Sequence, residues 1–263
     1  MPAYCSSLMQ DLPAMLHMQA DRRRVLRMLS LGAVAPLAIA ASGNVSGASC
    51  SVIPSETAGP FPGDGTNRNA DGVANVLTQS GVVRNDIRAS FAGMSGKATG
   101  ALLTLNLKLV NSNANCASLA GRAIYLWHCT RDGAYSLYTS GVTQQNFLRG
   151  VQVTDDNGEV SFVTIFPGCY PGRWPHMHFE IIDSLAAATS GKNRIKTSQL
   201  ALPANVCAQV YANAAYEASA ANFNGMSIKD DGIFGADSAV QMASVTGDAT
   251  NAYTATLTIG IAA

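Results

Sequence analysis

The stretch Ala101-Leu-Leu-Thr-Leu-Asn-Leu-Lys-Leu-Val-Asn111 alternates apolar and polar side chains along its length. Every second residue from Leu103 to Leu109 is a leucine, and Thr, Asn and Lys stand between them. Successive side chains of a β-strand point to opposite faces of its sheet, so this spacing places Leu103, Leu105, Leu107 and Leu109 on one face. The stretch therefore predicts a half-buried strand, with one face toward a core and the other toward water.

Further short strands are expected on both sides of this one. They are predicted at residues 123–128, 151–153, 160–165, 176–182 and 253–261. The turn Asp155-Asp-Asn-Gly158 predicts a β-hairpin between the second and third of these, because Asn-Gly accepts positive φ at little cost. Several short strands separated by turn residues are typical of an all-β, antiparallel β-sandwich.

Two parts of the chain depart from the strand pattern. Pro203 stands at a first-turn position, and the apolar residues after it, Val206, Val210 and Tyr211, follow helical spacing. Residues 43 to about 100 are rich in Gly, Ser, Asn and Pro and predict an irregular N-terminal arm over the sandwich. We therefore expect residues 43–263 to form a single β-sandwich domain with this arm and one or two short helices.

Composition excludes several classes of protein. The chain has 263 residues, 48% of them hydrophobic, and equal numbers of basic and acidic residues, 17 of each. That is too apolar for a disordered chain and long enough for one sizeable core. Lys and Arg do not cluster beyond the first thirty residues. A nucleic acid partner is therefore not expected.

Residues 1–42 have the pattern of an export signal. Arg22-Arg-Arg24 precedes the apolar run from Met28 to Ala41, which ends in small residues near Ala40. A membrane span needs about 20 apolar residues, whereas this run is shorter and contains Pro36, so no stable span is expected. The arginines resemble a twin-arginine signal, which predicts export to the periplasm or beyond the cell.

Five of the six cysteines lie beyond this leader, and they are Cys50, Cys116, Cys129, Cys169 and Cys207. In an oxidising compartment up to two disulfides and one free thiol are expected, with the connectivity left open. A lipid-modified Cys50 is an alternative, but the residues before it lack the bulky apolar side chain that such sites usually have.

The segment Tyr170-Pro-Gly-Arg-Trp-Pro-His176-Met-His178 indicates a metal site. Side chains two apart on a strand share a face at about 6.6 Å, a gap that two imidazoles can close around one ion. Glu180 shares that face and raises the alternative of a two-histidine, one-carboxylate iron(II) site. It lies about 13 Å along the strand from His176, however, so it is not expected to bind the same ion.

Tyrosines complete the candidate donor set. A phenol with a pKa near 10 binds metal poorly unless a strongly charged cation holds it as phenolate, which favours iron(III) over zinc. Tyr135, in Gly133-Ala-Tyr-Ser136, and Tyr170 are the candidates. Most tyrosines are instead buried rings with a hydrogen-bonded hydroxyl. That interpretation is adopted for Tyr125, Tyr138 and Tyr211.

From about Pro54 to about Gln199 the chain resembles the intradiol ring-cleavage dioxygenase family, particularly exported members similar to the protocatechuate 3,4-dioxygenase beta chain. The motifs that carry the resemblance are Thr57-Ala-Gly-Pro-Phe, Leu126-Trp-His-Cys-Thr-Arg-Asp-Gly-Ala-Tyr135-Ser, Phe147-Leu-Arg-Gly-Val-Gln-Val-Thr-Asp155, Ile165-Phe-Pro-Gly-Cys-Tyr170-Pro-Gly-Arg173, His176-Met-His178 and Thr197-Ser-Gln199.

The resemblance implies an iron(III) centre, Fe(3+), that uses molecular oxygen to open a small catecholic ring between its two hydroxyl-bearing carbons. It places four residues on the metal: Tyr135, Tyr170, His176 and His178. In relatives the second tyrosine leaves the metal when the catechol binds and takes up a substrate proton, which would be Tyr170. Arg173 would stabilise negative charge on the ring, and Gln199 would lie near the bound oxygen.

Other interpretations of these residues stay open. Arg173 could be a salt bridge at a loop edge, Arg149 could shape the pocket or brace the hairpin, and His128 is expected to be structural. Ala58 stands where many relatives have glutamate, and Phe61-Pro62 where many have two tyrosines, so the substrate's substituents stay open, as does the oligomeric state. The rival function is a secreted β-sandwich module that binds metal or aromatic ligands without turnover.

Overall fold

The computed structural model describes residues 50–263 of the protein. The predicted export signal, residues 1–42, lies outside the described residues and stays a prediction. The strands are β1 (Asp64–Asn69), β2 (Gly72–Asn75), β3 (Leu102–Asn111), β4 (Ala117–Ser118), β5 (Ala123–Trp127), β6 (Arg149–Val153), β7 (Glu159–Ile165), β8 (His176–Ile182), β9 (Arg194–Ala201), β10 (Ser244–Asp248) and β11 (Ala252–Ile261). The helices are α2 (Ala204–Tyr211) and α3 (Glu217–Phe223).

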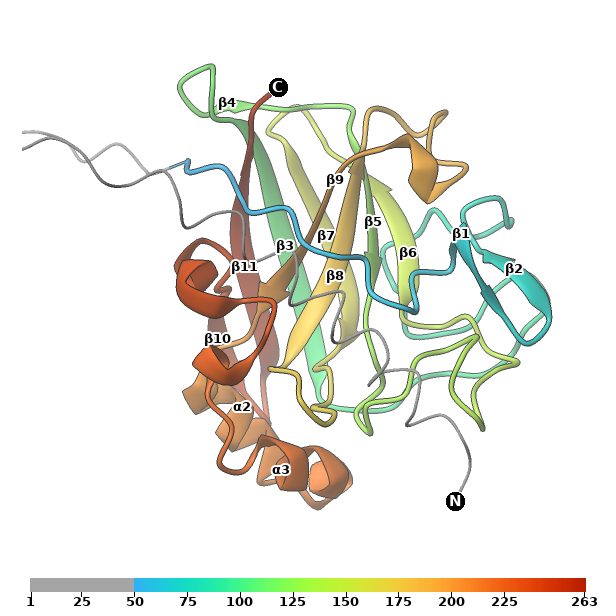
Figure 1. Cartoon of the computed structure of the whole chain (residues 1–263), viewed down its shortest axis with the longest axis vertical. Coiled ribbons are helices and arrows are strands. Elements are labelled where there is room, and N and C mark those ends of the chain that lie inside the picture. The colour runs from blue at the N-terminus through green and yellow to red at the C-terminus, as the bar shows by residue number, and fades with distance from the viewer. Residues whose placement is uncertain (1–49) are drawn as a thin grey trace, which may run out of the picture. The chain divides into compact units, whose positions relative to one another are not determined.

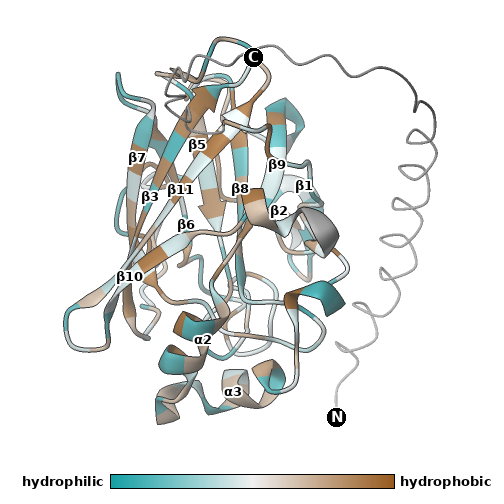
Figure 2. Ribbon diagram, turned by 90° about the vertical axis from the view of Figure 1, so that its left-hand side faces the viewer, coloured by the Kyte–Doolittle hydropathy of each residue, from teal (hydrophilic) through white to brown (hydrophobic). Residues whose placement is uncertain are grey.

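Two sheets face each other and form the sandwich (Figure 1). One contains β10, β11, β3 and β7, with β4 at the end of β3, and the other runs in the order β6, β5, β8, β9. Leu103, Leu105, Leu107 and Leu109 of β3 form one core with Phe162 of β7 and with Leu126, Met177 and Phe179 of the second sheet. Figure 2 shows the apolar segments gathered along these strands. The all-β sandwich predicted from the alternating pattern is therefore confirmed.

Both helices lie beyond one end of the sheets (Figure 1). The helix predicted after Pro203 is α2, which turns Val206, Val210 and Tyr211 toward the core. Among residues 50–263, no helix has the length and apolar character needed to cross a membrane.

The predicted hairpin at Asp155–Gly158 is wrong. The turn forms, with Gly158 at φ 74° and its N–H donating to the Asp155 carbonyl at 2.9 Å. The strands that it joins, however, pair elsewhere: β6 with β5 and β7 with β3. The turn therefore carries the chain from one sheet to the other. Local turn chemistry makes the reversal possible, but the partners of the strands are decided by which sheet buries them.

The pairing of β3 with β11 also departs from a purely antiparallel sandwich. These strands run parallel over nine aligned positions, from Tyr253 opposite Leu103 to Ile261 opposite Asn111. The alternation seen in both stretches is the same for parallel and antiparallel neighbours, so it does not reveal strand direction.

The arm predicted for residues 43 to about 100 is seen from Cys50 onward. It carries the small β1–β2 ribbon, and its apolar side chains, among them Val76, Leu77 and Val82, cover the face of β5 that points away from the inter-sheet core. The sheet containing β5 and β8 is thus buried on both faces.

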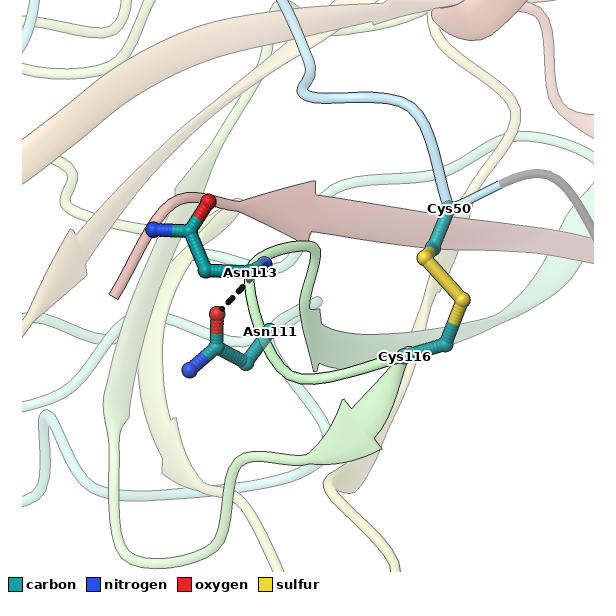
Figure 3. Close-up of a disulfide and its surroundings, with 4 residues drawn as sticks. All are labelled: Cys50, Asn111, Asn113 and Cys116. Atoms are coloured by element: carbon teal, nitrogen blue, oxygen red, sulfur yellow. Dashed lines mark hydrogen bonds between the residues drawn. A yellow bond between two sulfur atoms is a disulfide. The ribbon is translucent and has the colours of Figure 1, made fainter.

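A disulfide joins Cys50 of the arm to Cys116, between β3 and β4 (Figure 3). It excludes the lipid-modified Cys50. Cys129, Cys169 and Cys207 are free and buried. Of the up to two disulfides expected among the five cysteines beyond the leader, one therefore forms.

Replacing Cys116 with serine should destabilise the fold. The disulfide spans 66 residues of sequence. In the chain-entropy model, a loop of that size contributes about 4 kcal/mol to the free energy of unfolding. Urea unfolding of the variant should show this loss, and reductant should bring the wild type down to the variant while leaving the variant unchanged. A wild type insensitive to reductant would contradict the prediction.

Candidate metal centre and active site

The two histidines of the site lie at the start of β8, beside β5 and β9. Met177 and Phe179 point into the inter-sheet core, so the alternating His176 and His178 point to the opposite face, beneath the arm. Across the ladder His178 is aligned with Trp127 of β5, and the two rings stack with centroids 5.0 Å apart and planes at 10°. The stacked indole holds the His178 ring in one orientation.

The two tyrosines come from the loops at the same end of the sheet. Tyr135 lies between β5 and β6, and Tyr170 between β7 and β8. The loops approach closely at Gly133, where an added Cβ would come within 3.0 Å of the Tyr170 Cβ and where φ is +83°. Only glycine meets both demands without strain. Thr139 then fixes the Tyr135 loop by accepting a hydrogen bond from the Tyr135 N–H at 2.9 Å.

The four predicted donor atoms converge. The Tyr135 hydroxyl lies 3.2 Å from His178 Nε2 and 3.5 Å from His176 Nε2, and the two phenol oxygens are 3.4 Å apart. The Tyr170 hydroxyl lies 3.0 Å from His176 Nε2, and the two Nε2 atoms are 3.1 Å apart. Ligands bound at about 2.0 Å around one metal ion lie roughly 2.9 to 3.4 Å from one another. The observed spacing fits that of a single coordination sphere.

The imidazoles are prepared to act as ligands. His176 Nδ1 contacts the Trp174 carbonyl at 2.5 Å, which requires Nδ1 to carry the proton and leaves the lone pair on Nε2. Burial is the main cause that lowers the pKa of both imidazoles well below the usual value, and the Arg173 charge acts in the same direction. Both rings are therefore neutral at neutral pH, as metal binding requires.

The phenols decide which kind of metal fits. Burial raises the pKa of Tyr135 well above its usual value, and it raises the pKa of Tyr170 to about 12 against the opposing charge of Arg173. Only a strongly charged cation would hold both as phenolates. Among residues 50–263, no group of three or more His, Cys, Asp or Glu side chains is placed to hold a metal ion. A metal here would thus depend on the phenolates, a donor set that fits a hard trivalent ion.

Arg173 is buried beside the donors, with 9% of its surface exposed. Its Nε donates to the Asp231 carboxylate at 2.9 Å and its Nη2 donates to Gln199 Oε1 at 2.6 Å. Arg173 therefore does form the salt bridge of the alternative interpretation, but its partner Asp231 is itself only 2% exposed, so the pair is buried. Gln199 is also fully engaged, because its amide nitrogen donates to the Thr57 carbonyl at 2.9 Å.

Part of the arm covers the donors. A Cβ added to Gly59 would lie 3.6 Å from His178 Cε1, and the ring of Phe61 lies 5.1 Å from that of Tyr135. Ala58 and Phe61, the positions where the chain departs from many relatives, both pack partly buried against this side of the sheet. The roof of the site is therefore built from the segment 57–62.

Arg149 fastens this roof. Its guanidinium is buried, with 1% exposure, and donates to the carbonyls of Phe61 and Pro62 at 2.9 and 2.6 Å. It also donates to the Ser136 hydroxyl and carbonyl, both at 3.0 Å. Arg149 thus ties the arm to the loop that carries Tyr135, rather than bracing a hairpin.

Several residues outside the donor set have structural roles, as expected. Both nitrogens of His128 are satisfied, by the Cys129 carbonyl at 2.8 Å and the Thr164 hydroxyl at 2.7 Å. The hydroxyls of Tyr125, Tyr138 and Tyr211 donate to Pro62, Asn67 and Pro167 respectively.

Glu180 has its contacts away from the four donor atoms. Its carboxylate accepts a hydrogen bond from Thr197 at 3.4 Å and lies 3.8 Å from Arg194 Nε. Burial raises its pKa to about 8, with the nearby Asp64 adding to the rise. It does not join the imidazoles in a two-histidine, one-carboxylate set.

The β-sandwich thus brings two phenols and two imidazoles together beneath a roof, with a buried arginine alongside. Residues 83–194, which hold the four donors and Arg173, match the family model described as "Dioxygenase". The resemblance to the intradiol ring-cleavage dioxygenases predicted from the sequence is thereby confirmed.

Solved structures were compared with the chain as well, and the one at a TM-score of 0.61 shows the fold alone. The chain is similar to an intradiol ring-cleavage dioxygenase from Tetranychus urticae, with a TM-score of 0.61 and 23% identity over 81% of this chain and 95% of that one. It is also similar to the dioxygenase domain of a dioxygenase and carbohydrate-binding protein fusion from Streptomyces sp. SirexAA-E, with a TM-score of 0.45 and 18% identity over 80% and 98% of the two chains. A search of curated proteins gave no match.

Proposed function

We propose that the protein is a non-haem iron(III) dioxygenase that uses molecular oxygen to open a catecholic ring between its two hydroxyl-bearing carbons. The observation that carries this proposal is the convergence of two phenol oxygens and two imidazole nitrogens, in which the Tyr135 hydroxyl and His176 Nε2 each lie within 3.0 to 3.5 Å of the other three atoms. The family match over residues 83–194 supports the same class of reaction.

Tyr135, Tyr170, His176 and His178 would hold the iron. A bound iron(III) would supply the Lewis acidity that makes a catechol ring reactive toward dioxygen. The two phenolates and the two neutral imidazoles together would neutralise two of the three positive charges of the ion. The site would then accept a catechol that brings negative charge of its own.

Of the two tyrosines, Tyr170 is the better placed to give up its position on the metal to the substrate. Tyr135 is 2% exposed and packs under Phe61, whereas Tyr170 is only partly buried. Because burial raises the pKa of Tyr170 to about 12, its phenolate is a strong enough base to take a proton from a catechol hydroxyl. This asymmetry supports Tyr170 as the residue that accepts the substrate proton.

Arg173 would supply positive charge to the ring as electron density builds on it. Its anchors on Asp231 and Gln199 hold the guanidinium in one place before the reaction begins. A preorganised donor of this kind in a water-poor site stabilises the transition state by about 3 kcal/mol. A module that only binds metal or aromatic ligands would not need this buried cation.

The reaction test uses iron-loaded protein and a panel of substituted catechols. Each turnover should consume one dioxygen per ring and give a product with two carboxylates, and labelled dioxygen should place one oxygen atom in each. A colour change on binding without oxygen uptake across the panel would instead support the binding module. A semialdehyde product would mean cleavage beside the hydroxyls and would overturn the role of the two tyrosines.

A further inference from the structure

Asp231 lies in the segment between α3 and β10, after a 3-10 turn at Ile228–Asp230. Its side chain accepts four hydrogen bonds in a site with 2% exposure. One carboxylate oxygen accepts from Arg173 Nε at 2.9 Å and from the Trp174 N–H at 2.7 Å. The other accepts from the N–H groups of Ile233 and Phe234 at 2.8 and 3.3 Å. The second pair fixes the carboxylate, and the fixed carboxylate then holds the corner at residues 173–174.

This corner leads directly to the candidate metal donors. The Trp174 carbonyl accepts from His176 Nδ1, and Trp174 is held at its N–H by Asp231. Arg173 is held at Nε by Asp231 and at Nη2 by Gln199. Two contacts at different nitrogens fix both the position and the plane of the guanidinium, which a single contact would not do.

The Asp231 carboxylate also neutralises the buried charge of Arg173. A guanidinium stays charged in this buried setting, and a buried charge without a partner is strongly unfavourable. Arg173 and Asp231 form a buried ion pair, with side chains 10% and 0% exposed. Without Asp231, the arginine would be drawn toward solvent and away from the pocket.

We propose that Asp231 is a positioning residue that holds Arg173 against the substrate, so that a segment outside residues 83–194 completes the site. This inference rests on the proposed function. The alternative is a purely structural role, in which Asp231 only caps its own turn at Ile233 and Phe234. The proposal differs because it requires Asp231 to act through Arg173.

A double-mutant cycle separates the two roles. Asp231→Asn keeps the size of the side chain but removes its charge, and it should lower kcat by about 10- to 100-fold, as loss of an outer partner of a site residue does. The same substitution should lower kcat much less in an Arg173→Gln background, because Asp231 then keeps only its contacts with backbone N–H groups such as that of Trp174. The matched control is Asp230→Asn, which removes the same charge from an exposed neighbour and should leave kcat unchanged.

Two measurements accompany kcat. The iron content and the visible absorption band of the iron-loaded protein report whether the donors are intact. Thermal unfolding of the four proteins of the cycle reports the Arg173–Asp231 coupling without any turnover. If Asp231→Asn does not fold, the cycle is run with Asp231→Glu, which keeps the charge but moves it by one methylene. Asp231→Glu should also lose much more rate when Arg173 is present.

Multiplicative losses of kcat in the double variant would overturn the inference, and so would an unchanged rate in the variant used. An inactive wild type would contradict the proposed function first, whereas an active wild type with independent losses would contradict this inference alone.

Discussion

Replacing Tyr135 with phenylalanine is expected to reduce the iron content of the isolated protein from close to one iron(III) per chain to a small fraction of that. The substitution removes only the phenol oxygen that lies 3.2 to 3.5 Å from the other three donors, and leaves the ring under Phe61. His178→Ala should have the same effect, because it removes one of the two Nε2 ligands. Elemental analysis of protein made with iron and zinc both available measures the result.

The matched control is Tyr138→Phe. Tyr138 also packs against the Phe61 ring, with centroids 5.1 Å apart, but its hydroxyl donates to Asn67. This variant should keep its iron and its reddish colour. Stoichiometric zinc without iron in the wild type would contradict the proposed centre, whatever the variants show.

Replacing Arg173 with glutamine is expected to lower kcat by about 100-fold or more while iron and catechol binding persist, because the lost stabilisation belongs mainly to the transition state. Glutamine can still reach a neighbouring hydrogen-bond partner, but it carries no charge to meet the electron density on the ring. Steady-state oxygen uptake gives kcat, and titration of the visible band gives catechol affinity.

Arg88→Gln serves as the control for charge. Arg88 pairs with Asp86 in a partly exposed ion pair of the arm. Its loss should therefore change neither kcat nor catechol affinity appreciably. If Arg173→Gln instead lost its iron, Arg173 would be a structural support of the donors. An unchanged kcat would remove it from the reaction altogether.

The strands and the two histidine donors were predictable from sequence because both depend on short-range patterns. Alternation along β3 and β8 marks the faces of the strands, and the His-x-His pair sits on one such face. The tyrosines lie in loops, where spacing alone says nothing of direction. Their assignment came from the family resemblance, and the structure brings both hydroxyls to the histidines.

What the sequence did not reveal depends on long-range contacts. The strands on either side of the Asp155–Gly158 turn belong to different sheets, and the direction of β11 beside β3 is set by the path of the whole chain. Asp231 escaped notice for the same reason, since 58 residues separate it from Arg173 and no local motif marks it. The contacts of Gln199 with Arg173 and the arm were not predicted either, and its place near the bound oxygen stays a prediction.

The way in which the arm is fastened has an evolutionary consequence. Gln199 and Arg149 bind the roof through the carbonyl oxygens of Thr57, Phe61 and Pro62, atoms that every amino acid possesses. Substitutions at Ala58 or Phe61 can therefore change the shape of the roof without removing any of these hydrogen bonds. A lineage carrying this scaffold could adapt to differently substituted rings by drift at two positions, while the centre beneath them stays as it is.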